Sequence, residues 1–158
     1  MQMKKYLSYL GLCLAFLLYG CNEDDVFEIF ANGQTWYWSS SYDTTNWEDD
    51  NKWDMTLSID DVARINSTKD SYYVRFSDDG TVEGKGNAIT FNGRWSANGE
   101  DHSFSINIKS DRTPSGLDKT FFDEISNAKF YRGDATLIKL FNIDKNHFIQ
   151  FSTIRMTK

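Results

Sequence analysis

SYYVRFSDDGTVEG, residues 71–84, has the pattern of two short strands joined by a turn. Aromatic and β-branched residues fill 71–77, Asp78-Asp79-Gly80 follows, and the chain resumes with Thr81–Gly84. Such residues favour strands, and an Asp-Gly pair favours the tight turn of an antiparallel hairpin. The stretch therefore predicts a β-hairpin, and with it an antiparallel sheet as the framework of the chain.

Strand patterns continue toward the C-terminus. Residues 88–96 and 102–109 predict two strands joined by a two-residue turn at Asn98-Gly99. In the second strand Phe104, Ile106 and Ile108 share one face, as the period of two requires. Three further strands are expected as a closing meander, at 129–132, 136–141 and 147–154.

One helix is expected between these strands, over residues 115–127. Ser115 lies three residues before Asp118, which is a capping-box arrangement. Asn127 favours the left-handed conformation that often ends a helix. The apolar residues recur at helical spacing, as Leu117, Phe121, Phe122 and Ile125.

The segment before the hairpin contains more polar connections. Residues 34–39 predict a strand, 40–52 a long acidic loop, and 61–70 a polar connection with Val62 and Ile65 as inward anchors. Residues 53–60 alternate apolar and polar over four cycles, which is the strongest single strand signal in the chain. The fold class predicted is mainly β (α+β): a small antiparallel sheet or partly closed barrel with one helix.

The first twenty residues have the layout of an export signal. Lys4 and Lys5 precede an apolar run at 6–19, which is shorter than the roughly 20 residues of a membrane-spanning helix. The run ends in Leu18-Tyr19-Gly20-Cys21, which resembles the lipobox of bacterial lipoproteins. We therefore expect residues 1–20 to be removed and Cys21 to carry the lipid.

This expectation attaches the mature chain to a membrane without a transmembrane helix, because two or three acyl chains anchor durably. The acidic tract Asn22–Asp25 resembles the surface-export signal of Bacteroidetes lipoproteins, and it is equally consistent with a solvated tether over 21–29. We expect an outer-membrane lipoprotein, on the periplasmic face or at the cell surface.

The composition of the chain excludes several classes of function. Removing residues 1–20 leaves 138 residues, enough for one domain (30–158), and changes the net charge from −6 to −8. That charge argues against nucleic acid as a partner. The mature chain keeps only Cys21, so a disulfide, a thiolate zinc site and a Cys nucleophile are excluded. The core must come from apolar residues, to which 12 Phe, 8 Tyr and 5 Trp contribute.

Aromatic residues are unusually dense between positions 36 and 53. They form either a stacking platform for a glycan or another flat ligand, with Glu48, Asp49 and Asp50 at its edge, or part of the core. Both interpretations stay open at this point. The candidate ligand-binding residues are Trp36, Trp38, Tyr42, Trp47 and Trp53.

No catalytic motif is present. His102 and His147 are 45 residues apart, and the chain has no nucleophile elbow, zinc-protease helix or phosphate loop. The oxygen-rich segments 142–146 and 48–51 lack the glycine and distal glutamate of a calcium loop, so polar turns explain them better. We expect no catalytic residues, no bound metal and no cofactor.

The order of residues resembles the META (HslJ-like) domain. Residues 76–87 resemble its Gly-rich signature, with Gly93 and Trp95 as the trailing pair. The resemblance covers residues 30–154, with 40–70 as an insertion. It implies a small β domain with one helix, no known catalysis, and a role in protein interaction or envelope stress. A lipocalin-like barrel that holds a glycan or an apolar small molecule is the alternative, although three strands after the helix favour META.

Overall fold

The computed structural model describes residues 22–49 and 51–155. The predicted signal segment and Cys21 lie outside this range. Within it, three helices occur: α2 (Asn22–Phe30), α3 (Ile59–Ser67) and α4 (Gly116–Ser126). The strands are β1 (Trp36–Thr44), β2 (Trp53–Met55), β3 (Tyr73–Phe76), β4 (Thr81–Lys85), β5 (Thr90–Ala97), β6 (Phe104–Ser110), β7 (Phe130–Gly133), β8 (Leu137–Phe141) and β9 (His147–Ser152).

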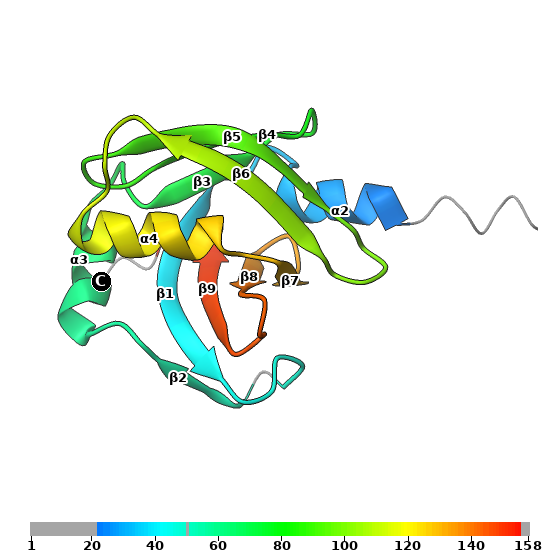
Figure 1. The fold of residues 1–158 in the computed structure, drawn as a ribbon, viewed down its shortest axis with the longest axis horizontal. Helices are drawn as coiled ribbons and strands as arrows, with labels where there is room; N and C mark the ends of the chain where they lie inside the picture. Colours follow the sequence, from blue (N-terminus) through cyan, green and yellow to red (C-terminus); the bar gives the residue numbers. More distant parts are fainter. Residues whose placement is uncertain (1–21, 50, 156–158) are drawn as a thin grey trace, which may run out of the picture.

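The strands form one antiparallel sheet that rolls around α4 (Figure 1). Its order is β6-β5-β4-β3-β1-β9-β8-β7, with β2 paired to the end of β1. The two outer strands approach each other, because the Phe104 amide donates to the Lys129 carbonyl (2.8 Å) and the Tyr131 amide to the His102 carbonyl (2.9 Å). Only the bridge between Ser103 and Phe130 forms there, so the barrel stays partly open and the predicted fold class is confirmed.

The core fills the concave side of the sheet, and helices close it. The Phe30 ring of α2 packs against four aromatic rings at centroid distances of 5.0–5.6 Å. At the other end the Phe121 ring of α4 stacks on Trp38 at 5.2 Å. Residues 22–29, expected to form an acidic tether, are thus a helix whose Val26 and Phe30, four apart, enter the core.

A β-bulge in β1 sets which side chains face this core. Trp38 pairs with Phe151 of β9, but the next β9 residue, Gln150, pairs with Ser40, so β1 contains one extra residue. Side chains alternate between the faces of a strand, so an extra residue reverses the alternation beyond it. Trp36 and Trp38 point inward before the bulge, whereas Tyr42 stacks on Phe148 at the outer face after it.

The segment after β1 differs from the prediction. Residues 40–44, expected in a loop, continue β1. The alternating stretch 53–60 forms only the short strand β2, and α3 begins at Ile59. The Ser58 side chain caps α3 by accepting from the Asp61 amide (3.1 Å), a local signal that outweighs the alternation. Ile65 is buried as predicted, and Val62 is half-buried.

Helix α4 is confirmed, with Ser115 and Asn127 at its two ends, but the predicted geometry of both caps is wrong. Ser115 makes no side-chain cap bond, and Asn127 has φ −91°, outside the left-handed region. Asp118 accepts instead from the backbone amides of Asn87 (2.6 Å) and Ala88 (2.8 Å). A β-carbon at Gly86 would lie 2.4 Å from this carboxylate, which explains a glycine there.

Both predicted hairpins exist, but only one of them has the predicted turn. The turn at Asp78-Asp79-Gly80 is confirmed, with Gly80 at φ +81°. The connection between β5 and β6 is not a two-residue turn. It spans residues 98–103, and the positive φ is at His102 (+57°) rather than at Asn98 or Gly99. The closing meander β7–β8–β9 is as predicted.

Candidate functional site

The bulge in β1 separates the candidate ligand-binding aromatics into two groups. Trp36 and Trp38 are 0% and 1% exposed. The Trp36 indole donates to the Phe30 carbonyl (3.0 Å), and that of Trp38 donates to the Ser41 hydroxyl (3.1 Å). These two residues fill the core and offer no surface on which a ligand could stack.

The other three belong to an aromatic cluster on the outer face of β1, β8 and β9. The outer-face cluster consists of Tyr42, Trp47, Trp53, Phe130, Phe141 and Phe148. Trp47 covers Phe130 and Phe141, and the Lys145 ammonium lies 3.9 Å above the Trp47 ring. The Trp47 carbonyl also accepts from Arg132 (2.6 Å), which fixes the covering loop. Trp47 therefore shields the sheet, as a core residue would.

Trp53 is the candidate that stays accessible. Its side chain is 47% exposed, and its ring meets Tyr42 edge to face at a centroid distance of 4.7 Å. Thr44 holds the loop that leads to it, because its hydroxyl contacts the carbonyls of Lys52 (2.5 Å) and Asn46 (3.0 Å). The tryptophan is therefore presented on an anchored strand.

Beside it lies a shallow, polar pocket of about 310 Å³. This Trp53 pocket is lined by Asp43, Thr44, Thr45, Asn51, Lys52, Trp53 and Asp54. The acids expected at the edge of the platform are elsewhere: Asp49 caps its own turn through the Asn51 amide (2.9 Å), and Glu48 is exposed outside the pocket. Asp50 lies outside the described residues.

An ionic network joins the pocket to α4. His147 Nδ1 lies 2.7 Å from Asp43 Oδ1, and His147 Nε2 lies 3.0 Å from Glu124 Oε1. The other oxygen of Glu124 accepts from the buried Ser41 hydroxyl. The hydrogen bond to Glu124, and to a smaller extent the one to Asp43, stabilises the charged imidazolium of His147. Together they raise the pKa of His147 to about 9, although burial acts in the opposite direction.

This network does not have the arrangement of a hydrolase. Ser41 is fully buried and donates to Glu124, so it is not placed as a nucleophile activated by His147. His147 is protonated at neutral pH, so it is no general base. Its evident role is to hold α4 against β1 and β9. We call the group of Asp43, Glu124 and His147 the ionic clasp. The sequence does not reveal this network, because its three partners are far apart in the chain, at positions 43, 124 and 147.

The oxygen-rich turn 142–146 is occupied by its own hydrogen bonds. The Asn142 amide donates to the Asn146 side chain (2.7 Å), and Asn142 Oδ1 accepts from the Asn146 backbone amide (3.1 Å). Among the described residues no cluster of three His, Cys, Asp or Glu side chains is arranged to hold a metal ion. The second histidine, His102, lies in the β5–β6 connection with its ring 5.2 Å from that of Tyr131.

The clasp predicts that stability falls in alkaline solution. Because the pKa of His147 is raised from 6.5 to about 9 in the folded chain, its stabilisation is complete below about pH 6.5 and is lost as pH rises through 9. A pKa shift of this size corresponds to an upper limit of about 3 kcal/mol in the free energy of unfolding. The actual contribution is smaller, because solvent screens the exposed Asp43 carboxylate. The free energy of unfolding in urea, measured for wild type and His147→Gln from pH 6 to 10, tests this dependence.

We expect the two curves to converge as pH approaches 10, with wild type more stable at pH 6. His102→Gln is the matched control, because its substitution leaves the clasp intact. A constant difference between wild type and His147→Gln across the pH range would contradict the clasp.

Comparison with known proteins corrects the resemblance to the META domain. Residues 21–153 match the family model "Domain of unknown function (DUF4847)". A crystal structure of a DUF4847 family protein from Bacteroides vulgatus is similar, with a TM-score of 0.68 and 28% identity over 84% of this chain and 99% of that one. An NMR structure of a protein from Burkholderia xenovorans shares the fold, with a TM-score of 0.50 and 12% identity over 85% and 89% of the two chains.

No curated protein matches the chain. The META assignment was wrong because it relied on the order of strands, glycines and one helix, which unrelated antiparallel β domains share. The chain belongs to the DUF4847 family.

Proposed function

We propose that this protein is a non-enzymatic, lipid-anchored envelope protein that binds a glycan at the Trp53 pocket. The observation that carries the proposal is the half-exposed Trp53 ring beside a polar pocket. An aromatic ring offers a flat apolar surface for the C–H face of a sugar, and nearby polar groups bond its hydroxyls.

The pocket supplies suitable polar groups. Asp43 and Asp54 are paired across β1 and β2, so their carboxylates share one face of this strand pair, opposite the face on which Trp53 pairs with Thr44. Asn51 and Lys52 add an amide and an ammonium donor at the rim.

This proposal places the alternative ligand-binding role at the surface rather than in the barrel. The concave side is filled by large side chains, including Trp36, Trp38 and Phe121, which leaves a lipocalin-like apolar ligand without support. The expected role in protein interaction or envelope stress followed from the META resemblance, and it loses that support with the family assignment.

Substitution of Trp53 tests the glycan site. Against a panel of glycans, with the mature chain carrying Cys21→Ser, we expect a ligand whose affinity falls at least tenfold in Trp53→Ala, because the stacking surface is gone. Isothermal titration calorimetry measures the affinity. Ile143→Ala, which removes another exposed apolar side chain, is the control and should bind like wild type.

Two results would count against the glycan site. One is a panel without any bound glycan. The other is a glycan that binds Trp53→Ala as tightly as wild type.

The lipid anchor is tested independently. No helix within the described residues is long and apolar enough to cross a membrane. We expect wild type to incorporate labelled palmitate and to fractionate with the outer membrane, whereas Cys21→Ser stays folded and unlabelled. Labelling of Cys21→Ser at the wild-type level would refute the anchor.

A further inference from the structure

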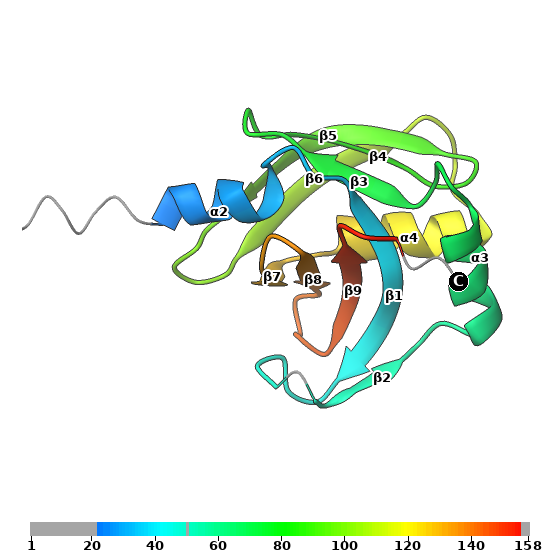
Figure 2. The ribbon, with the colours of Figure 1, turned by 180° about the vertical axis from the view of Figure 1, so that it is seen from behind.

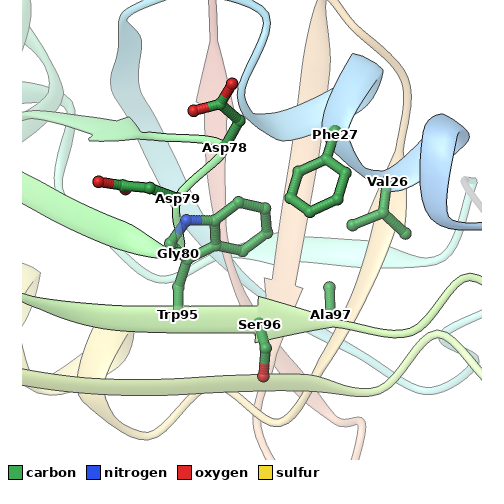
Figure 3. A pocket seen from close by; sticks show the side chains of 8 residues that line it. All are labelled: Val26, Phe27, Asp78, Asp79, Gly80, Trp95, Ser96 and Ala97. Carbon is green, nitrogen blue, oxygen red and sulfur yellow. The ribbon is translucent and has the colours of Figure 1, made fainter.

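A second concave surface lies where α2 meets β5 and the β3–β4 turn. Figure 2 shows α2 far from β2. This α2 groove is lined by Val26, Phe27, Asp78, Asp79, Gly80, Trp95, Ser96 and Ala97. Figure 3 shows the rings of Phe27 and Trp95 next to each other, with Asp78 and Asp79 on the Trp95 side. The groove shares no residue with the Trp53 pocket.

Its apolar wall is built by the register of α2. Val26 and Phe30 enter the core, which turns Phe27 to the helix flank, where it is 39% exposed. The Phe27 ring meets Trp95 at right angles with centroids 6.2 Å apart. Trp95 is 6% exposed, and its indole N–H already donates to the Ser77 carbonyl (3.0 Å). The accessible ring surface of this wall therefore comes mainly from Phe27. The indole N–H of Trp95 is already engaged in a hydrogen bond.

The rim opposite is rigid and negative. The Gly80 amide closes the turn on the Ser77 carbonyl (3.0 Å), and the Trp95 amide ties the turn to β5 through the Gly80 carbonyl (2.9 Å). Thr81 donates to the Asp79 carboxylate from its hydroxyl (2.6 Å) and its amide (2.9 Å), which lowers the pKa of Asp79. Asp79 is thus ionised at neutral pH, and Asp78 adds an exposed carboxyl group.

Charge around the groove is strongly acidic. Among the side chains of α2 that the structure describes, 25–30, Asp25 and Glu28 are exposed acids, and this segment contains no Lys or Arg. The cation that contacts the turn is Arg94, which donates to the Asp79 backbone carbonyl (3.1 Å). An anionic ligand or an anionic membrane surface would be repelled here, whereas a cation would be attracted.

We propose that the α2 groove binds a lysine or arginine side chain from a basic segment of a partner protein. The apolar stem of such a side chain lies along the exposed Phe27 ring, next to Trp95, and its charged head reaches toward Asp78 and Asp79. An exposed aromatic ring, here Phe27, and nearby carboxylates both attract a cation. Trp95 is too buried for a sugar to stack on it, which distinguishes this groove from the Trp53 pocket.

A capped hexapeptide with two central lysines is the probe, and the same peptide with norleucine in place of lysine is its uncharged counterpart. Amide chemical shifts of the mature Cys21→Ser chain are recorded during titration. We expect the lysine peptide to shift resonances of α2, 77–80 and 95–97, and to bind at least fivefold more tightly than the norleucine peptide. Affinity should fall as salt is raised, because the contact is ionic.

Two variants locate the contact. Asp78→Asn removes an exposed charge without touching the core, and it should weaken lysine-peptide binding at least threefold. Phe27→Ala removes the exposed ring and should weaken it at least fivefold. Asp144→Asn and Ile154→Ala change an exposed acid and an exposed apolar residue elsewhere, and should bind like wild type.

Equal binding of the two peptides would overturn the proposal, and so would wild-type affinity in Asp78→Asn. Absence of shifts at α2 and 77–80, or shifts there with vesicles of anionic lipid instead of peptide, would also overturn it. Glycan binding at Trp53 is expected to be unaffected by either groove variant, so failure of one proposal is distinguishable from failure of the other.

Discussion

One extra residue in β1, opposite β9, is the constraint on which the rest of the structure depends. Before the bulge, Trp36 and Trp38 face the core, and after it the same alternation sends Tyr42 outward and Ser41 inward. Without the extra residue, Trp36, Trp38 and Tyr42 would all share one face of β1. The bulge therefore lets one strand supply both the core and the outer-face cluster.

The ionic clasp and the exposed tryptophan follow from this reversal. Asp43 and Ser41 lie on the side of β1 that faces α4, so both can join the network of Glu124 and His147. On the opposite side, Tyr42 supports the Trp53 ring from below. The polar pocket thus lies where a rigid ion network and an aromatic cluster meet, which is a suitable place for a preorganised binding site.

Local patterns in the sequence were sufficient for the hairpin at 71–84, the helix at 116–126 and the closing meander, because each depends on neighbours in the chain. Local patterns were insufficient where contacts between residues far apart in the sequence determine the structure. The sequence of α2 is typical of an acidic tether because few of its residues are apolar, and of these Val26 and Phe30 are buried in the core. Trp53 was identified as a candidate, but its separation from Trp36 depends on a register with β9 that no local pattern contains.

The central claim is that the bulge in β1 determines which side chains of this strand face the core and which face outward. Deletion of Ser39, the extra residue, tests this claim most directly. Removing one residue should force Tyr42 toward the core and Asp43 away from His147, so we predict that the deletion variant shows no cooperative urea transition. Deletion of Asn98, in the exposed β5–β6 connection, should retain a cooperative transition and serves as the control. A Ser39 deletion variant that unfolds cooperatively, with wild-type stability and an unchanged alkaline loss of stability, would contradict the account.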